Sequence, residues 1–124
     1  MIRKQSDYRI DERPEMRGGN GTVRIEHLFE PGTELKAPTR LCAKLYLEPG
    51  VSIGFHRHEN EEEIFVIVKG QGEIDDNGTS RQVAARISRV SLPVFFTACP
   101  APFPVRTESP AATCLLVPLS SISP

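Results

Sequence analysis

The sequence has almost no excess of charge of either sign. Its 15 lysines and arginines stand against 16 aspartates and glutamates, so the formal net charge is −1. Nucleic-acid-binding domains normally show a basic excess or a basic stripe, and this class is therefore excluded. Long apolar segments are also missing, because residues 90–105, one of the two longest uncharged stretches, contain four prolines. A membrane-spanning helix needs about 20 apolar residues, so we expect no membrane insertion.

Cysteine is scarce, and the first residues do not predict a secretory signal. The three cysteines, Cys42, Cys99 and Cys114, lie far apart and form no CxxC pair, which is typical of reduced thiols in the cytosol. The first residues are basic, but no apolar segment of a signal peptide follows them. We therefore expect a cytoplasmic protein without a disulfide framework. Its 124 residues are the length of one domain with a core of its own.

No helical periodicity runs through the chain, and short strand-like segments are present instead. Residues 41–47 place Leu41, Ala43, Leu45 and Leu47 on one face of a strand. Asn77-Gly78 is a strong signal for a hairpin between residues 73–75 and 81–83. Further strands are expected at 23–29, 51–58 and 64–68. The pattern predicts an all-β jelly-roll barrel or sandwich over residues 23–124, preceded by an arm or loop at residues 1–22.

The expected strand at residues 64–68 is apolar on both of its faces. A barrel strand that faces water should alternate between apolar and polar residues, so the outer face of this strand must pack against something. We predict a homodimer. The alternative is that the N-terminal arm of the same chain covers this face.

The composition changes sharply near residue 84. Residues 85–124 contain 7 of the 11 prolines but only 4 charged residues. Because proline cannot donate a ladder hydrogen bond, Pro100, Pro102 and Pro104 cannot occupy a central strand, although residues 90–96 and 113–117 can still pair. Whether residues 85–124 complete the barrel is left open, and the barrel is expected to be incomplete or irregular after residue 84.

One segment carries residues suited to metal chemistry. His56 and His58, at i and i+2 of a strand, project from the same face and can converge on one ion. Glu63 opens the next strand and can return a carboxylate to that face, a ligand set that suits Mn, Fe, Ni or Zn. If Glu63 faces inward, Phe65 and Ile67 share its face and form an apolar pocket wall. The alternative is a pair of ordinary histidines followed by a solvated acidic loop.

The pattern Gly50-x5-His56-x-His58-x4-Glu63-x6-Gly70 resembles the first motif of the cupin superfamily. From about residue 18 to residue 83, the chain is similar to the small single-domain cupin 2 conserved-barrel proteins, some of which are described as oxalate decarboxylase-like. The resemblance implies a double-stranded β-helix, a dimer and a divalent metal inside the barrel. It also implies that His56, His58 and Glu63 are the metal ligands.

The second cupin motif is absent, since no histidine follows His58. By family spacing the missing ligand falls near Thr97, and three explanations remain open. In the first, Cys99 supplies a thiolate as the further ligand, which favours Zn or Fe. In the second, three protein ligands and water hold the ion. In the third, the segment after Ala84 has lost its ancestral sequence through a shifted reading frame, which impairs metal binding. The coding DNA tests this third explanation.

Two functions follow from these observations. The first is a metal-dependent enzyme acting on a small carboxylic acid or sugar derivative, with the metal as Lewis acid. The second is a non-catalytic or vestigial cupin that binds a small ligand with a weakened or lost metal site. No catalytic residue is assigned, and His27, a lone histidine in the expected strand at 23–29, is interpreted as a packed or surface residue.

Overall fold

The computed structural model describes residues 1–56, 61–76, 78–85, 88–91 and 112–120. In this part of the chain the regular elements are strands and two short 3-10 turns, η1 (Gln5–Asp7) and η2 (Met16–Gly18). The strands are β1 (Arg9–Pro14), β2 (Thr22–Phe29), β3 (Cys42–Leu47), β4 (Glu61–Lys69), β5 (Gln71–Asp76), β6 (Thr79–Ala84), β7 (Ser88–Ser91) and β8 (Ala112–Ser120). None of the described residues forms a helix long and apolar enough to cross a membrane.

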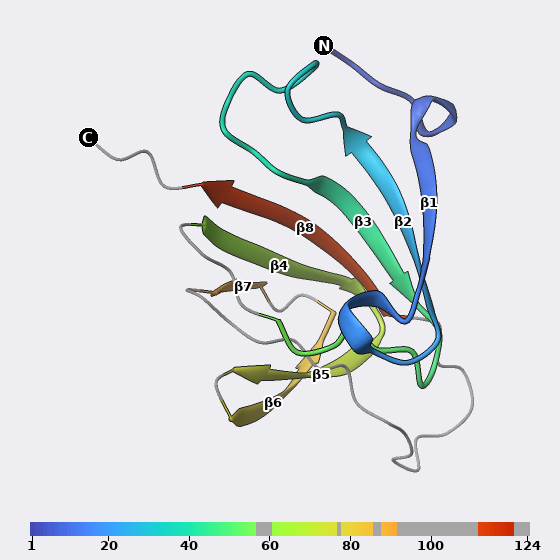
Figure 1. The fold of residues 1–124 in the computed structure, drawn as a ribbon, viewed down its shortest axis with the longest axis vertical. Helices are drawn as coiled ribbons and strands as arrows, with labels where there is room; N and C mark the ends of the chain where they lie inside the picture. The colour runs from blue at the N-terminus through green and yellow to red at the C-terminus, as the bar shows by residue number, and fades with distance from the viewer. Residues whose placement is uncertain (57–60, 77, 86–87, 92–111, 121–124) are drawn as a thin grey trace.

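The strands form one large sheet and one separate hairpin (Figure 1). The large sheet is antiparallel, with the strand order β1-β2-β3-β8-β4-β7, and β5 pairs with β6 in the second sheet. The turn is predicted at Asn77-Gly78, between these two strands, and Gly78 has a φ of 83°. This arrangement confirms the predicted all-β fold, and the two sheets do not close into one continuous ladder within the described residues.

The core lies on the inner face of the strands, as the alternation in the sequence predicts. Along β3, Ala43, Leu45 and Leu47 are buried while their neighbours are half-buried. The rest of the core comes from β2, β4, the β5–β6 hairpin and the segment after β3: Val23, Ile25, Ile53, Phe65, Ile67, Ile74 and Val83. Complete burial of such side chains contributes about 1.5–3 kcal/mol each. The core therefore fixes which face of the sheet encloses the site described below.

The N-terminal segment differs from the prediction of an arm or loop. Residues 9–14 form β1, which pairs with β2 from Arg9↔His27 to Pro14↔Thr22. Its side chains are exposed except for the half-buried Asp11. An edge strand is held by backbone hydrogen bonds on one side only, so it needs no apolar alternation, which is the signal that sequence reading depends on.

The expected strand at residues 51–58 is wrong for residues 51–56, which form no strand, while residues 57–58 lie outside the described residues. Their backbone forms hydrogen bonds to the η2 loop, residues 15–20, instead of to a neighbouring strand. The amide of Ser52 donates to Asn20 O at 2.8 Å, and the amide of Gly54 donates to Met16 O at 2.9 Å. The tertiary contact with η2 therefore overrides the local preference for extended pairing.

The proline-rich part of the chain contributes to the large sheet. β8 lies between β3 and β4, and β7 pairs with β4 at the edge. Pro118 pairs with Glu63 of β4, but the pairing of β8 with β3 ends at Leu116. Proline is tolerated there because it lies beyond the β3 ladder. Residues 92–111, which include Pro100, Pro102 and Pro104, lie outside the described residues.

The outer face of β4 is partly open. Ile64 and Val66 are half-buried and Val68 is 53% exposed. β4 lies next to β7 at one edge of the sheet, whereas β1 lies at the opposite edge. The predicted homodimer stays a prediction.

Candidate functional site

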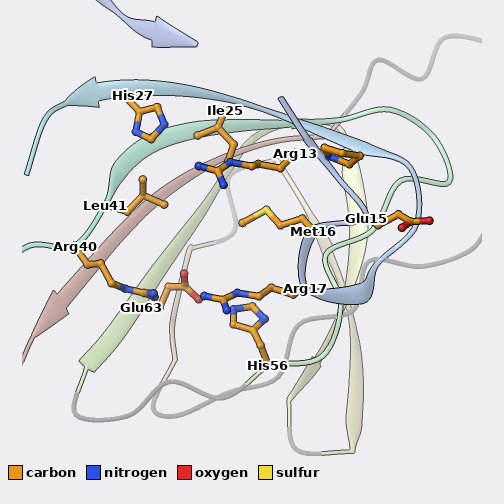
Figure 2. Close-up of a pocket in the computed structure, with 11 residues that line it drawn as sticks. Arg13, Glu15, Met16, Arg17, Ile25, His27, Arg40, Leu41, His56 and Glu63 are labelled. Carbon is orange, nitrogen blue, oxygen red and sulfur yellow. The ribbon is translucent and has the colours of Figure 1, made fainter. Parts of the chain in front are cut away.

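A cavity of about 540 Å³ lies on the inner side of the large sheet (Figure 2). It is lined by residues 13–17, Ile25, His27, residues 40–41, His56 and Glu63. This volume is within the range of sites that bind small organic molecules. Two of the three predicted ligands, His56 and Glu63, therefore face one cavity.

Glu63 enters the cavity because of its place in the alternation of β4. The burial of Glu63, Phe65 and Ile67 alternates with the half-buried Ile64 and Val66, as predicted for an inward-facing glutamate. Its side chain is 3% exposed. A buried carboxylate needs a cation or hydrogen-bond donors to offset its lost hydration, and the cavity supplies cationic groups.

His56 is half-buried, and the hydrogen bond of its ring fixes the tautomer. Its Nδ1 lies 2.9 Å from Gly54 O. A carbonyl oxygen only accepts, so Nδ1 carries the proton and Nε2 carries the lone pair in the neutral ring. A backbone carbonyl bonded to the other ring nitrogen is the usual support of a metal-binding imidazole.

The donor set fits a divalent metal ion, because an imidazole nitrogen and a carboxylate are present in one cavity. Both glycines of the motif, Gly50 and Gly70, take positive φ values of 83° and 80°, which other residues adopt only with strain. His58 and Cys99 lie outside the described residues. Within the described part of the chain, no group of three histidine, cysteine, aspartate or glutamate side chains is close enough to hold a metal.

Sequence reading missed the arginines of the site. Arg13, Arg17 and Arg40 line the cavity and are exposed at its rim. In Figure 2 the guanidinium groups of Arg17 and Arg40 point toward the carboxylate of Glu63. These arginines come from β1, η2 and the loop before β3, and no spacing in the sequence connects them.

The η2 loop carries two of the lining residues in an unusual backbone conformation. Glu15 and Arg17 have φ values of 46° and 56°, on either side of Met16. Non-glycine residues rarely adopt this region, and it persists only where surrounding contacts enforce it. Here the contacts are with residues 50–54: Asn20 Nδ2 donates to Gly50 O at 2.9 Å, and Ser52 Oγ accepts from the Asn20 amide at 2.8 Å. The loop is thereby fixed beside the cavity.

His27, interpreted from the sequence as a packed or surface residue, is buried and also lines the cavity. It lies on β2, on the inner face with Val23 and Ile25, and is 6% exposed. Its Nε2 lies 3.1 Å from Asp11 Oδ2 on β1. The signal that could have found it is its period-two spacing from Val23 and Ile25, which places it on the core side of the strand.

The chain is similar to known cupins over most of its length. The family model for the cupin domain matches residues 44–87. An oxalate-binding protein of Thermotoga maritima is 36% identical over 85 residues, which are 68% of this chain and 69% of that protein. The crystal structure of a predicted oxalate decarboxylase from T. maritima matches with a TM-score of 0.82 and 28% identity, over 98% of this chain and 100% of that one.

A further structural match shows the fold alone. The structure of a Cupin 2 conserved barrel domain protein from Salinispora arenicola has a TM-score of 0.64 and 20% identity, over 98% of this chain and 89% of that one. Together, the fold, the motif within a ligand-sized cavity and the identity to the oxalate-binding protein lead to one conclusion: the chain belongs to the cupin family.

Proposed function

We propose that this cupin holds a divalent metal through His56, His58 and Glu63 and binds a small carboxylic acid beside it. The observation that carries the proposal is the common cavity: His56 and Glu63 line it together with three arginines at its rim. When bound, the ion would supply Lewis acidity to an oxygen of the ligand. Mn, Fe, Ni and Zn all suit these ligands.

The charges around the cavity favour an anionic ligand. Three arginines and two glutamates, Glu15 and Glu63, line it, so the lining is net positive with neutral histidines, before any metal is added. A guanidinium binds a carboxylate through two parallel hydrogen bonds. Exposed arginines at the mouth also attract anions from solution. The names of the T. maritima relatives make oxalate the first carboxylate to test, while a sugar derivative has less support from these charges.

The first experiment measures metal content by elemental mass spectrometry on untagged protein. We expect close to one metal ion per chain in the parent and a loss of at least tenfold in the His56→Ala, His58→Ala double variant and in Glu63→Gln. Glu48→Gln is the matched control, because Glu48 is exposed and lies outside the cavity. Equal metal content in the parent and Glu63→Gln would refute the assigned ligand set.

A non-catalytic or vestigial cupin is the second candidate function. It is favoured by the missing second motif, since no histidine follows His58. Titration with oxalate distinguishes the two candidates. Oxalate binding without metal supports a ligand-binding cupin with a lost metal site, whereas metal-dependent binding supports the proposed metal site. Consumption of the bound oxalate with release of carbon dioxide would in addition identify an enzyme.

Three expectations from the sequence remain predictions beside this proposal. The exposed Val68 on the outer face of β4 supports the homodimer. The cytoplasmic location rests on the cysteine pattern. The altered reading frame after Ala84 still needs the coding DNA, although β7 and β8 from that segment pair within the sheet.

A further inference from the structure

The candidate metal ligand His56 is connected to the N-terminal part of the chain through a single residue, Gly54. The carbonyl oxygen of Gly54 accepts a hydrogen bond from His56 Nδ1 at 2.9 Å. The amide of Gly54 donates to Met16 O in η2, also at 2.9 Å. Gly54 is buried, so neither of its backbone groups can lose its partner without cost. The orientation of the His56 ring therefore depends on where the η2 loop holds Gly54.

Two side chains fasten the η2 loop to residues 50–54. Asn20 Nδ2 donates to Gly50 O at 2.9 Å, and the amide of Asn20 donates to Ser52 Oγ at 2.8 Å. The amide of Ser52 donates in return to Asn20 O at 2.8 Å. Asn20 and Ser52 are not among the residues that line the cavity. Both side chains can therefore be changed without altering the cavity wall itself.

The backbones of the two segments are in direct contact. A methyl group at Gly19 would overlap Ser52 O and lie 2.7 Å from the carbonyl carbon of Ser52 and 2.8 Å from Gly54 N. Arg17 has a φ of 56°, a conformation that persists only where the surrounding contacts enforce it. Closely packed segments of this kind do not shift gradually against each other. The η2 loop is therefore held in one arrangement relative to Gly54.

We propose that the η2 loop is a positioning element of the metal site, with Asn20 and Ser52 as its positioning residues. They hold Gly54 where its carbonyl oxygen keeps the proton of the neutral His56 ring on Nδ1 and leaves the lone pair on Nε2 for a metal ion. This inference rests on the proposed function for the presence of the metal. It extends the site beyond residues 44–87, which the cupin family model matches, because η2 precedes them.

The first test measures the affinity for Zn²⁺ by competition with a chromophoric chelator. We expect the Kd of Asn20→Ala and of Ser52→Ala to rise about tenfold, the lower end of the effect of disturbing an outer partner of a metal ligand. Gln82→Ala is the matched control, because it removes a side-chain hydrogen bond of 2.7 Å to Glu73 in the β5–β6 hairpin, outside the cavity. It should keep the Kd of the parent. Circular dichroism at the temperature of the titration shows that each variant is folded.

The nitrogen NMR signals of the His56 ring test the positioning without any metal. They are identified by their absence in His56→Ala and are followed to the pH at which the ring is neutral. We expect the proton on Nδ1 in the parent and a mixture of tautomers in Asn20→Ala and Ser52→Ala, because the hydrogen bond of one ring nitrogen sets the tautomer. A role confined to stability would lower Tm and leave these signals unchanged. A proton on Nε2 in the parent would overturn the inference even if neither variant folds.

The outcomes separate this inference from the proposed function. If the parent binds Zn²⁺ and both variants bind it equally tightly, the positioning role is wrong and the metal site stands. If the parent binds neither Zn²⁺ nor any other of the proposed ions, the proposed function is refuted. The signals of the metal-free protein then decide: mixed tautomers in the variants support the positioning of His56, and an unchanged tautomer refutes it.

Discussion

Replacement of Gly54 by alanine should destabilise the protein, because the new methyl group would collide with the backbone of η2 at Arg17 and Gly18. A methyl group at this position would overlap the carbonyl oxygen of Arg17 and lie 2.7 Å from its carbonyl carbon and 2.8 Å from Gly18 C. Gly54 does not have a positive φ, so alanine fits its backbone conformation and the collision alone makes the difference. The atoms struck belong to the backbone, so no side-chain rotation relieves the contact.

The magnitude follows from two opposing terms. Overpacking of this kind costs about 1–3 kcal/mol, and a backbone–backbone collision belongs at the upper end of that range. Alanine also restricts the unfolded chain, which returns about 0.4–1 kcal/mol. The expected net loss in the free energy of unfolding is about 2 kcal/mol, or a fall in Tm of about 8 °C for a chain of this length.

The assay is denaturation by guanidinium chloride, followed by circular dichroism, on the parent, Gly54→Ala and Gly72→Ala. Gly72 is the matched control, because a methyl group there would have no heavy atom within 4 Å. Gly72→Ala should therefore be neutral or stabilise by about 0.5 kcal/mol. If the free energies of unfolding of the two variants differ by less than about 0.5 kcal/mol, the close packing of η2 against residues 50–54 is refuted.

Two further predictions concern charged groups in the sheet. Tyr46 Oη donates to Oε2 of Glu26 at 2.9 Å, and Glu26 is 2% exposed. Tyr46→Phe should therefore lower the free energy of unfolding by about 1.5–3 kcal/mol. The control, Tyr8→Phe, should lower it by less than about 0.5 kcal/mol, and equal losses in the two variants would contradict the prediction. The depressed pKa of Asp11, about 2 and due chiefly to Arg9, means that its ionised form stabilises the fold above pH ~4 and that this contribution is lost as the pH falls from ~4 to ~2. Acid denaturation of Asp11→Asn should lack that part of the pH dependence, and an unchanged acid transition would show that the ion pairs contribute nothing.

The sequence is sufficient for those parts of the fold that depend on local patterns. Period-two alternation gives β3 and its buried Leu45, and it also places Glu63 on the same face as Phe65 and Ile67. The Asn77-Gly78 pair gives the β5–β6 hairpin. In each case the signal lies within a few residues, because strand faces and tight turns are decided by neighbours in the chain.

The parts that were missed depend on contacts between distant segments. β1 is a polar strand that pairs with β2 at the edge of the sheet. Residues 51–56 hydrogen-bond to residues 16–20 instead of to a neighbouring strand. The arginines that line the cavity come from three separate segments, so their common location appears only in the folded chain. His27 is an intermediate case: its face was predictable, but its partner Asp11 lies on the strand that the sequence did not reveal.

The position of β8 has a consequence for the order in which the protein can be assembled during synthesis. Strands β1, β2 and β3 leave the ribosome first and β4 and β7 follow, yet in the described part of the chain these two groups are joined in the sheet by β8, whose Ala112 pairs with Leu47. Until β8 emerges, β3 and β4 each present an open edge that can pair with the wrong strand. The large sheet can therefore be completed only after closure of a long chain segment, a topology that slows folding and leaves strand edges unpaired during synthesis.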